Sequence, residues 1–289
     1  MKNLYDPISQ PYIFFRNITK TAKSLPHTCY HRHNAFEIYL FLSGSRKVCV
    51  ENAAYLCQPG DLFIIRPETF HAGLCDEDCE YDRIIMNIQP ALIDEICNKG
   101  AQINACFAFD GTAPIKRTHL GYHERKTVIE LFERFAAAQQ SNDYASTLLC
   151  DTYMLQYLIF VNRWFERDDD ISKEDNVMPQ LVSDIMDHIN RNITETITME
   201  KLADNFHFHG RYISKLFKEY TGLTIRTYIL DKRIGLAKKL LDEGCNVSEA
   251  CYHSGFNDYA NFLRSFKKYA GISPGRYKRE HGNRIDMPT

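Results

Sequence analysis

Three histidines and one glutamate in the first quarter of the chain have the residue types and spacing of a metal-ligand set. His31 and His33 flank a single residue, Glu37 follows closely, and His71 lies further along. Because side chains alternate across an extended strand, His31 and His33 share one face. Three imidazoles and a carboxylate can bind a divalent transition metal and leave coordination positions open. The same groups could instead hydrogen-bond an organic effector, for which further pocket candidates are Tyr39, Phe41, Arg66 and Phe70.

The last third of the chain predicts short helices arranged in two similar units. In the first unit, Thr198 suits the N-cap of a helix over 199–206. After a break, a second helix over 211–221 ends at Gly222, a suitable cap residue. Its inner face carries Ile213, Leu216 and Phe217, and its outer face carries Arg211, Ser214, Lys215 and Lys218. A short helix, a tight turn and a helix with a basic outer face is the form that places its second helix in the major groove of DNA.

A second unit of the same form follows. Residues 246–252 predict a short helix, and 258–270 predict a longer helix that ends at Gly271. The inner face of the longer helix holds Phe262, Phe266 and Tyr269, and its outer face offers Tyr259, Asn261, Arg264 and Lys268. Between the units, 225–241 predicts a rigid strut, which could hold two recognition helices about 34 Å apart on one face of DNA. The alternative is a helical bundle with a merely solvated basic face, and the tandem repeat argues against it.

The chain resembles the AraC/XylS family of transcription regulators over about residues 179–278. The second unit carries most of the likeness, through Gly255-Phe256, Phe262, Arg264, Phe266-Lys267-Lys268, Gly271, Ser273-Pro274 and Tyr277. The first unit matches through Leu202-Ala203, Tyr212-Ile213-Ser214, Leu216-Phe217-Lys218 and Gly222. Two departures are His209-Gly210, where the family usually has a capping serine followed by another residue, and Ala250-Cys251, which replaces a usual Ile-Ala.

This resemblance implies that side chains on both recognition helices read bases of double-stranded DNA. Carried over by position, the base-reading residues are Arg211, Ser214 and Lys215 for one half of the site, and Tyr259, Asn261 and Arg264 for the other. Arginine and lysine suit guanine edges, and asparagine suits adenine. The phosphate contacts expected are Lys218, Lys267 and Lys268.

The region from about 11 to 107 predicts a barrel or sandwich of short strands. Turn residues separate its short apolar runs, which are 36–42, 46–50, 61–65 and 83–88. The histidine pattern followed by Gly44, and then Pro59-Gly60-Asp61, Pro67 and His71, resembles the two motifs of the cupin superfamily. The second motif is one residue longer than usual between Gly60 and Pro67. This resemblance implies a small β-barrel with His31, His33, Glu37 and His71 at its mouth or interior.

Helical periodicity replaces the strand pattern from about 120 to 166. One apolar stripe comprises Val128, Leu131, Phe132 and Phe135, and a broader one comprises Leu148, Leu149, Met154, Leu155, Leu158, Ile159 and Val161. These stripes predict packing against the barrel or against a second copy, so we expect a homodimer that pairs through Leu148, Leu155 and Leu158. The charged stretch that follows predicts a solvated linker.

Composition narrows the class of protein. Hydrophobic residues make up 44% and charged residues 25% of 289 residues, as in a globular chain. Because there is neither a signal-peptide pattern nor an apolar run near the roughly 18 residues of a membrane span, we expect a cytoplasmic protein without a membrane partner. Its ten cysteines should be reduced thiols, since the chain is long and has no export signal. The closest pair, Cys75 and Cys79, is only a weak zinc signal. From Pro179 onward, 17 Lys and Arg face 13 Asp and Glu, a charge of +4 that suits a polyanionic partner.

Together these patterns predict an α+β chain of two domains. We expect a cupin-like sensor barrel over 1–107, a helical pairing segment over 108–166, a linker over 167–178 and a double helix–turn–helix over 179–289. The predicted function is sequence-specific DNA-binding regulation of transcription, controlled by a small-molecule effector such as a sugar, without enzymatic activity. The alternative is a metal-dependent cupin sensor or enzyme fused to a DNA-binding domain, with a divalent transition metal as cofactor.

Overall fold

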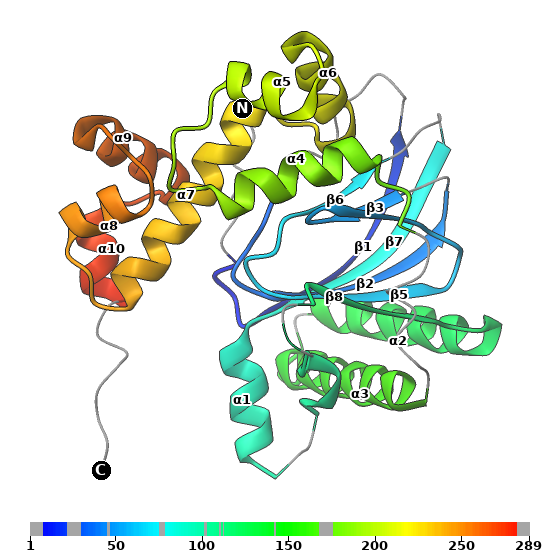
Figure 1. The fold of residues 1–289 in the computed structure, drawn as a ribbon. Helices are drawn as coiled ribbons and strands as arrows, with labels where there is room; N and C mark the ends of the chain where they lie inside the picture. Colours follow the sequence, from blue (N-terminus) through cyan, green and yellow to red (C-terminus); the bar gives the residue numbers. More distant parts are fainter. Residues whose placement is uncertain are drawn as a thin grey trace. The chain divides into compact units, whose positions relative to one another are not determined.

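A computed structural model describes residues 8–21, 30–44, 47–74, 79–100, 103–109, 111, 113–141, 143–167 and 176–281. The chain forms two compact units. Of the described residues, the sheet unit comprises those between 8 and 21 and between 32 and 177, and the helical unit comprises 30, 31 and those between 178 and 281. The predicted α+β class with two domains is confirmed (Figure 1).

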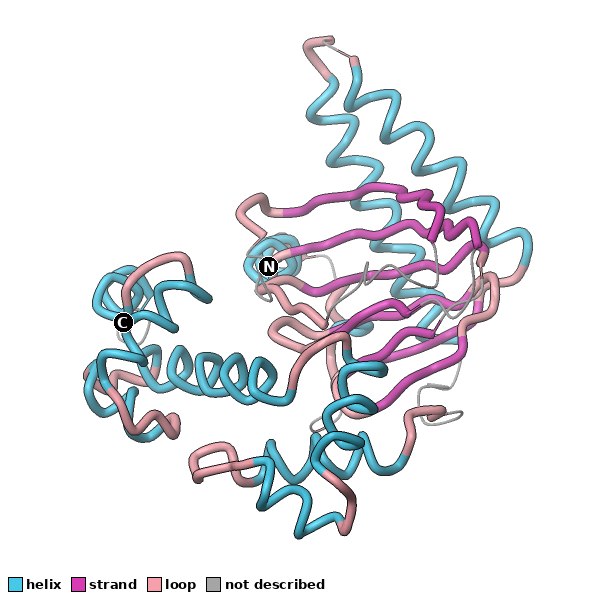
Figure 2. Tube along the Cα trace, turned by 90° about the horizontal axis from the view of Figure 1, so that it is seen from above, coloured by secondary structure: helices cyan, strands magenta, loops and turns pink. Residues whose placement is uncertain are grey.

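The sheet unit contains two antiparallel sheets (Figure 2). The larger has the order β1 (Tyr12–Thr21), β7 (Cys79–Ile88), β2 (Phe36–Ser43), β5 (Asp61–Ile65) and β8 (Ile115–His119). The smaller has the order β4 (Ala53–Leu56), β3 (Lys47–Val50) and β6 (His71–Leu74). The four apolar runs correspond to β2, β3, β5 and β7. The described strands pair within these two sheets, and their pairing does not show the closed barrel that we expected.

Three elements differ from the expected boundaries. The strand β8 lies beyond residue 107 and pairs with β5 from Asp61↔His119 to Ile65↔Ile115, so the sheet takes its last strand from the segment expected to be helical. Helix α1 (Pro90–Asn98) and the 3₁₀ turn η1 (Ala105–Phe107) lie within the segment expected to be β-rich. Of the expected linker, residues 168–175 lie outside the described residues.

Alternation along β2 separates the two cores of the sheet unit. Ile38 and Leu40 point to one face of the larger sheet and pack with helices α2 (Tyr122–Gln140) and α3 (Ser146–Arg167), which cover that face (Figure 1). Tyr39 and Phe41 point to the other face and pack against residues of the smaller sheet. Glu37 therefore lies on the face between the two sheets, because it shares the alternation of Tyr39 and Phe41.

The helix pair confirms one predicted stripe and corrects part of the other. Val128, Leu131 and Phe135 of α2 are buried against the larger sheet, as expected. Leu158, expected in a pairing surface, is instead 0% exposed inside the same core. Its position on α3 turns it toward α2 and the sheet, so it cannot contact a second copy.

The helical unit has seven described helices. They are α4 (Gln180–Arg191), α5 (Met199–Phe206), α6 (Gly210–Thr221), α7 (Ile225–Asp242), α8 (Val247–His253), α9 (Tyr259–Ala270) and α10 (Pro274–His281). The predicted units are α5–α6 and α8–α9, and α7 is the strut, about 27 Å long at 1.5 Å per residue. Tyr228 of α7 packs on Phe217 of α6 with ring centroids 5.5 Å apart, and Leu241 lies in the core of the second unit.

Local caps set these helix boundaries. The Thr198 hydroxyl accepts a bond from the backbone N–H of Lys201, 3.3 Å away, which confirms the predicted N-cap of α5. Gly222 and Gly271 end α6 and α9 with φ of 70° and 76°, a backbone region that glycine adopts without strain. His209 precedes α6 and makes no side-chain cap bond, so the departure from a capping serine leaves this helix start unsupported.

The described cysteines include both buried and partly exposed side chains. The cysteines whose side chains are described are free, and burial raises the pKa of the Cys106 thiol to about 12. Cys29 and Cys75 lie outside the described residues, and the side chain of Cys79 is not described. In the part of the chain that the structure describes, no helix is long and apolar enough to cross a bilayer.

Candidate functional site

The predicted ligand set comes together between the two sheets. Glu37 is at the start of β2, His33 lies four residues before it, and His71 begins β6 in the smaller sheet. Their exposed fractions are 6%, 3% and 3%. Glu37 Oε2 lies 3.1 Å from His33 Nε2 and 3.4 Å from His71 Nε2. His31 completes the cluster. Each of the four residues has one ligand atom that lies within 4.8 Å of the ligand atoms of the other three.

Backbone carbonyls orient both buried imidazoles. His33 Nδ1 lies 3.0 Å from the Ala35 carbonyl oxygen, and His71 Nδ1 lies 2.9 Å from that of Thr69. Because a carbonyl oxygen only accepts, each Nδ1 carries a proton and donates it. The Nε2 atom of each ring faces the Glu37 carboxylate. In a neutral ring that carries its proton on Nδ1, Nε2 is itself a hydrogen-bond acceptor.

Acceptors that face one another need a cation between them, either a proton or a metal ion. With protons, the site is a buried ion pair. Burial opposes the charged forms of both Glu37 and His71, but their mutual attraction and hydrogen bonds outweigh it. The pKa of Glu37 is therefore held well below its usual value, and the pKa of His71 is raised.

The donor set and its spacing also fit a divalent transition metal. Ligand atoms at about 2.1 Å from one ion, at octahedral or tetrahedral angles, lie about 3.0–3.4 Å apart. The separations of 3.1 Å and 3.4 Å from Glu37 to the two imidazoles lie in this range. Histidines that ligate metals usually donate their other ring N–H to a carbonyl or carboxylate, as both histidines do here. The residues present therefore fit such an ion.

Three of the other pocket candidates are buried, and the fourth, Arg66, is partly exposed. Tyr39 and Phe41 are buried between the sheets on the Glu37 face, and the Tyr39 hydroxyl hydrogen-bonds that of Tyr81. Phe70 is fully buried. Arg66 instead donates to the Gly111 carbonyl oxygen at 3.2 Å and lies over the Phe109 ring.

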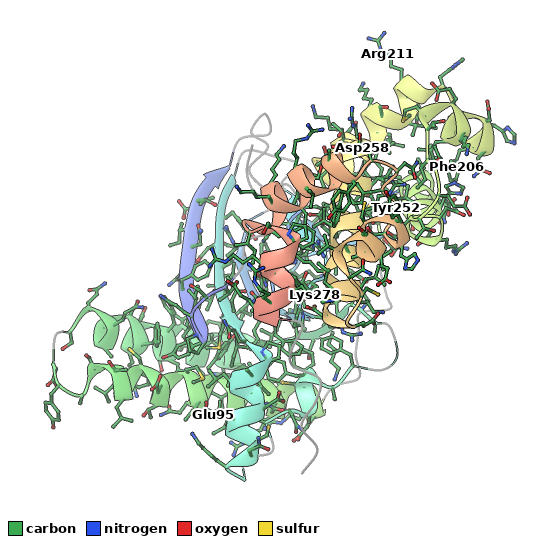
Figure 3. All side chains as sticks on the ribbon, turned by 90° about the vertical axis from the view of Figure 1, so that its left-hand side faces the viewer. Glu95, Phe206, Arg211, Tyr252, Asp258 and Lys278 are labelled. Carbon is green, nitrogen blue, oxygen red and sulfur yellow. The ribbon has the colours of Figure 1, made fainter. Side chains whose placement is uncertain are left out.

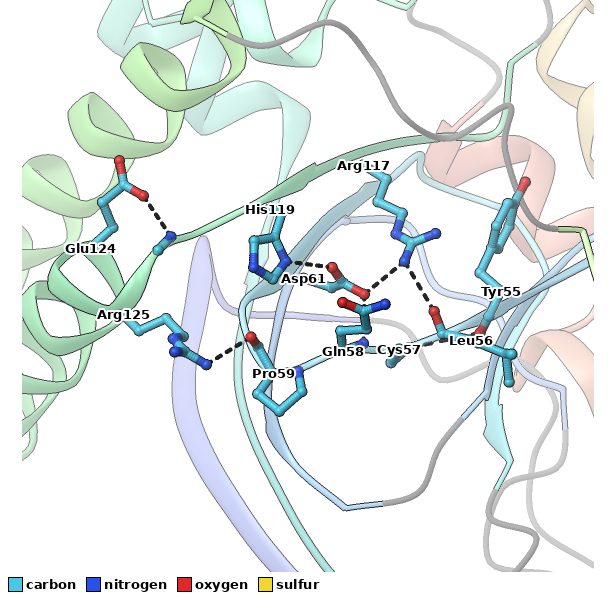
Figure 4. A network of polar contacts seen from close by, with 11 residues as sticks. Tyr55, Leu56, Cys57, Gln58, Pro59, Asp61, Arg117, His119, Glu124 and Arg125 are labelled. Atoms are coloured by element: carbon cyan, nitrogen blue, oxygen red, sulfur yellow. Dashed lines mark hydrogen bonds and ion pairs between the residues drawn. The ribbon is translucent and has the colours of Figure 1, made fainter.

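The turn before β5, Pro59-Gly60-Asp61, has a structural role. Asp61 accepts a bond from the Gln58 backbone N–H at 2.7 Å and from Arg117 Nη2 at 2.8 Å, and it contacts His119 Nδ1 at 2.9 Å (Figure 4). Arg125 of α2 donates to the Pro59 carbonyl oxygen at 2.7 Å. These bonds tie β8 and α2 to the turn, so Asp61 positions the sheet edge and is no member of the histidine cluster.

The structure places every predicted DNA-contacting side chain on the surface of the helical unit. On α6, Ile213 and Phe217 are buried, and Arg211 extends into solvent (Figure 3). On α9, Phe262 and Phe266 are buried. The predicted base-reading residues Arg211, Ser214, Lys215, Tyr259, Asn261 and Arg264, and the predicted phosphate contacts Lys218, Lys267 and Lys268, are all exposed.

Family models match both units. An AraC-like ligand binding domain matches residues 23–158, and a helix-turn-helix domain matches residues 202–280. The chain belongs to the AraC family. It is therefore a transcription regulator with a DNA-binding helix–turn–helix part and a ligand-binding part, and the predicted family membership is confirmed.

The chain is also similar to individual proteins. The probable transcriptional regulator LumQ of Photobacterium leiognathi is 24% identical over 251 residues, which cover 86% of this chain and 91% of LumQ. The HTH-type transcriptional regulator YtdP of Bacillus subtilis is 32% identical over 101 residues, which cover 34% of this chain and only 13% of YtdP. The crystal structure of ToxT from Vibrio cholerae with a bound unsaturated fatty acid is weakly similar, with a TM-score of 0.40, 13% identity, and coverage of 99% of this chain and 100% of that one.

The sequence pattern does not identify Asn87, a polar residue beside the histidine cluster. Asn87 of β7 pairs directly with Glu37 of β2 and is 6% exposed. Strand alternation from Ile85 is enough to assign the face of the sheet on which Asn87 lies. Its position next to Glu37 depends on the pairing of β2 with β7, which the sequence does not show.

Proposed function

We propose that this AraC-family chain binds a specific DNA sequence through α6 and α9 and is controlled by a small molecule bound at the histidine cluster. The observation that supports the DNA part is the exposure of two similar helix faces on a shared strut, α7. The first face carries Arg211, Ser214 and Lys215, and the second carries Tyr259, Asn261 and Arg264. These side chains have the hydrogen-bonding groups that distinguish bases in the major groove.

The proposed sensor site is the cluster of His31, His33, Glu37 and His71. These residues would hold a divalent transition metal, and such an ion supplies a Lewis-acidic position for an oxygen ligand. The protein residues orient the imidazoles, exclude bulk water and supply the negative charge of Glu37. A sugar is the effector class we propose first, because Tyr39 and Phe41 line the same face beside polar groups.

Pairing of two chains through α3 is the proposed link between sensor and DNA. Leu148 and Ile159 are large apolar side chains on the outer side of α3, with exposed fractions of 69% and 40%. Leu155 lies between them in the helix and is partly buried. An effector that changes how two α3 helices pair would change the spacing of two DNA-binding units, and pairing raises the effective concentration of the second unit on DNA.

Selection from a random pool of double-stranded DNA tests the proposed function. We expect the full chain to enrich sequences with two conserved blocks about one helical turn apart, one for each recognition helix. A variant with Arg211→Ala and Arg264→Ala should enrich no such pair of blocks. Equal enrichment by both proteins, or none by the wild type, would contradict the assignment of α6 and α9.

A further inference from the structure

Asn87 has a buried carbonyl oxygen that the protein itself does not satisfy. The side chain is 6% exposed, and its Oδ1 accepts no hydrogen bond from any described residue. Leaving a buried acceptor without a donor costs folding free energy, so most such atoms in proteins have a protein or water partner. The donor for Oδ1 is therefore expected to be a molecule other than the protein chain.

The strand register places Asn87 beside Glu37 of the histidine cluster. Asn87 pairs with Glu37 across β7 and β2, and with Ile13 across β7 and β1. Directly paired residues of antiparallel strands project from the same face, with their Cβ atoms about 4.5–5.5 Å apart. The neighbour two residues earlier on β7, Ile85, lies in the core between the sheets, whereas Met86 lies in the core under α2 and α3. Asn87 therefore shares the face of Glu37.

The chemistry of the site requires a proton on the group that occupies this space. Glu37 and Asn87 Oδ1 are both acceptors, so a bare carboxylate or carbonyl group between them would meet only acceptors. A water molecule or hydroxyl group can be held at the cluster through its oxygen and donate its proton to Asn87.

We infer that Asn87 is a ligand-binding residue of the sensor site, whose side-chain oxygen accepts a hydrogen bond from a water or hydroxyl ligand held at the His33–Glu37–His71 cluster. This inference rests on the proposed metal site. In this role, Asn87 selects a ligand that presents an O–H group over a ligand that presents a carboxylate at this point.

Titration of the metal-free full chain with Co²⁺ tests this role, because the ion reports both affinity and ligand environment in its visible absorption. We expect Asn87→Leu, which removes the acceptor and keeps the volume, to lower Co²⁺ affinity roughly 10- to 100-fold and to shift the absorption bands. Asn87→Ala, which introduces no new bulk, is the second variant and should behave in the same direction. Met86→Leu is the matched control on the opposite face of β7 and should bind Co²⁺ like the wild type.

Thermal unfolding separates this role from a structural one. Without metal, Asn87→Leu should unfold at a higher temperature than the wild type, because an unsatisfied buried polar atom has been removed. With Co²⁺, the variant should gain less stability than the wild type. If Asn87 only packs the core, Asn87→Leu should unfold at a lower temperature than the wild type without metal. That result would overturn the inference.

The histidine variant distinguishes failure of this inference from failure of the proposed site. Loss of Co²⁺ binding in His33→Ala, together with wild-type affinity and spectra in Asn87→Leu and Asn87→Ala, would overturn the role of Asn87 and leave the metal site in place. Wild-type Co²⁺ binding in His33→Ala would overturn both.

Discussion

Glu37 shows how one side chain can determine the chemistry of a site. Its carboxylate faces two imidazole nitrogens whose other ring atoms donate to the carbonyls of Ala35 and Thr69. That arrangement fixes the direction of both rings and leaves acceptors converging on one point. A cation at this point resolves the conflict, and the fixed rings reduce the reorganisation that its binding requires.

Metal content is the first prediction at this scale. We expect the purified, untagged protein to contain about one equivalent of a transition metal per chain, and a His31→Ala/His33→Ala variant to contain none. Elemental analysis measures both, and His123→Ala, which removes an exposed histidine of α2, should retain the metal. Absence of metal from the wild type would leave the histidines as hydrogen-bonding groups for an organic effector.

The DNA-contacting side chains give the second prediction. On the sequence recovered by selection, Arg264→Ala should weaken binding by about 1–3 kcal/mol and relax the preference at one base position. Lys268→Ala should weaken binding to all sequences alike and reduce the dependence on salt, since it loses a phosphate contact. Fluorescence anisotropy at two salt concentrations distinguishes these outcomes. Lys99→Ala, which removes an exposed lysine at the C-cap of α1, is the charge-matched control.

At the scale of elements, the turn between α8 and α9 is bound closely to the end of α4. Gly255 has φ of 87°, and a Cβ at this position would lie 2.7 Å from the Ile193 carbonyl oxygen and 2.8 Å from Thr194 Cα. Arg233 of α7 donates to the same Ile193 oxygen at 2.9 Å and to the Glu195 oxygen at 2.5 Å. The strut α7 and this turn therefore hold the segment after α4 in place.

Two glycine substitutions separate backbone strain from steric overlap at this contact. Gly271→Ala retains a positive φ in open space and should cost about 1 kcal/mol of unfolding free energy. Gly255→Ala adds overlap with backbone atoms to the same strain and should cost about 3 kcal/mol or more. Chemical denaturation of the full chain measures both values. Equal losses in the two variants would show that the close approach at Gly255 contributes nothing.

At the scale of the whole molecule, the outer side of α3 determines the proposed assembly. The exposed side chains Leu148 and Ile159 are three helical turns apart, and Leu158, which lies between them in sequence, faces inward. An apolar stripe that the chain's own fold leaves exposed is typical of a surface that another chain covers.

Substitution of this stripe predicts a change of mass. A Leu148→Glu/Ile159→Glu variant should sediment at the single-chain mass of 33.6 kDa, whereas the wild type should sediment at twice that mass. Gln139→Glu/Gln140→Glu on α2 adds the same charges at exposed positions and should remain paired. A dimer that survives the α3 substitutions would place the pairing surface elsewhere. Leu158 is unsuitable for this test, because a charge in the core would unfold the sheet unit.

Features that depend on local interactions could be predicted from the amino-acid sequence. The helices of both DNA-binding units follow from an apolar period, a cap such as Thr198 and a terminal glycine such as Gly222, all within one or two helical turns. The face shared by His31 and His33 follows from strand alternation in the same way. Exposure of Arg211 and Arg264 follows because each helix must bury its apolar side.

Features that depend on pairing between distant segments could not be predicted in this way. His71 reaches Glu37 only because β6 lies in the smaller sheet that packs against β2, and Asn87 lies beside Glu37 only through the register of β2 and β7. The apolar pattern of α3 could not separate Leu158 from Ile159, since neighbouring apolar residues look alike until the sheet and α2 choose one face. Strand register and helix rotation are set by packing across the whole unit, so they cannot be read from any single segment.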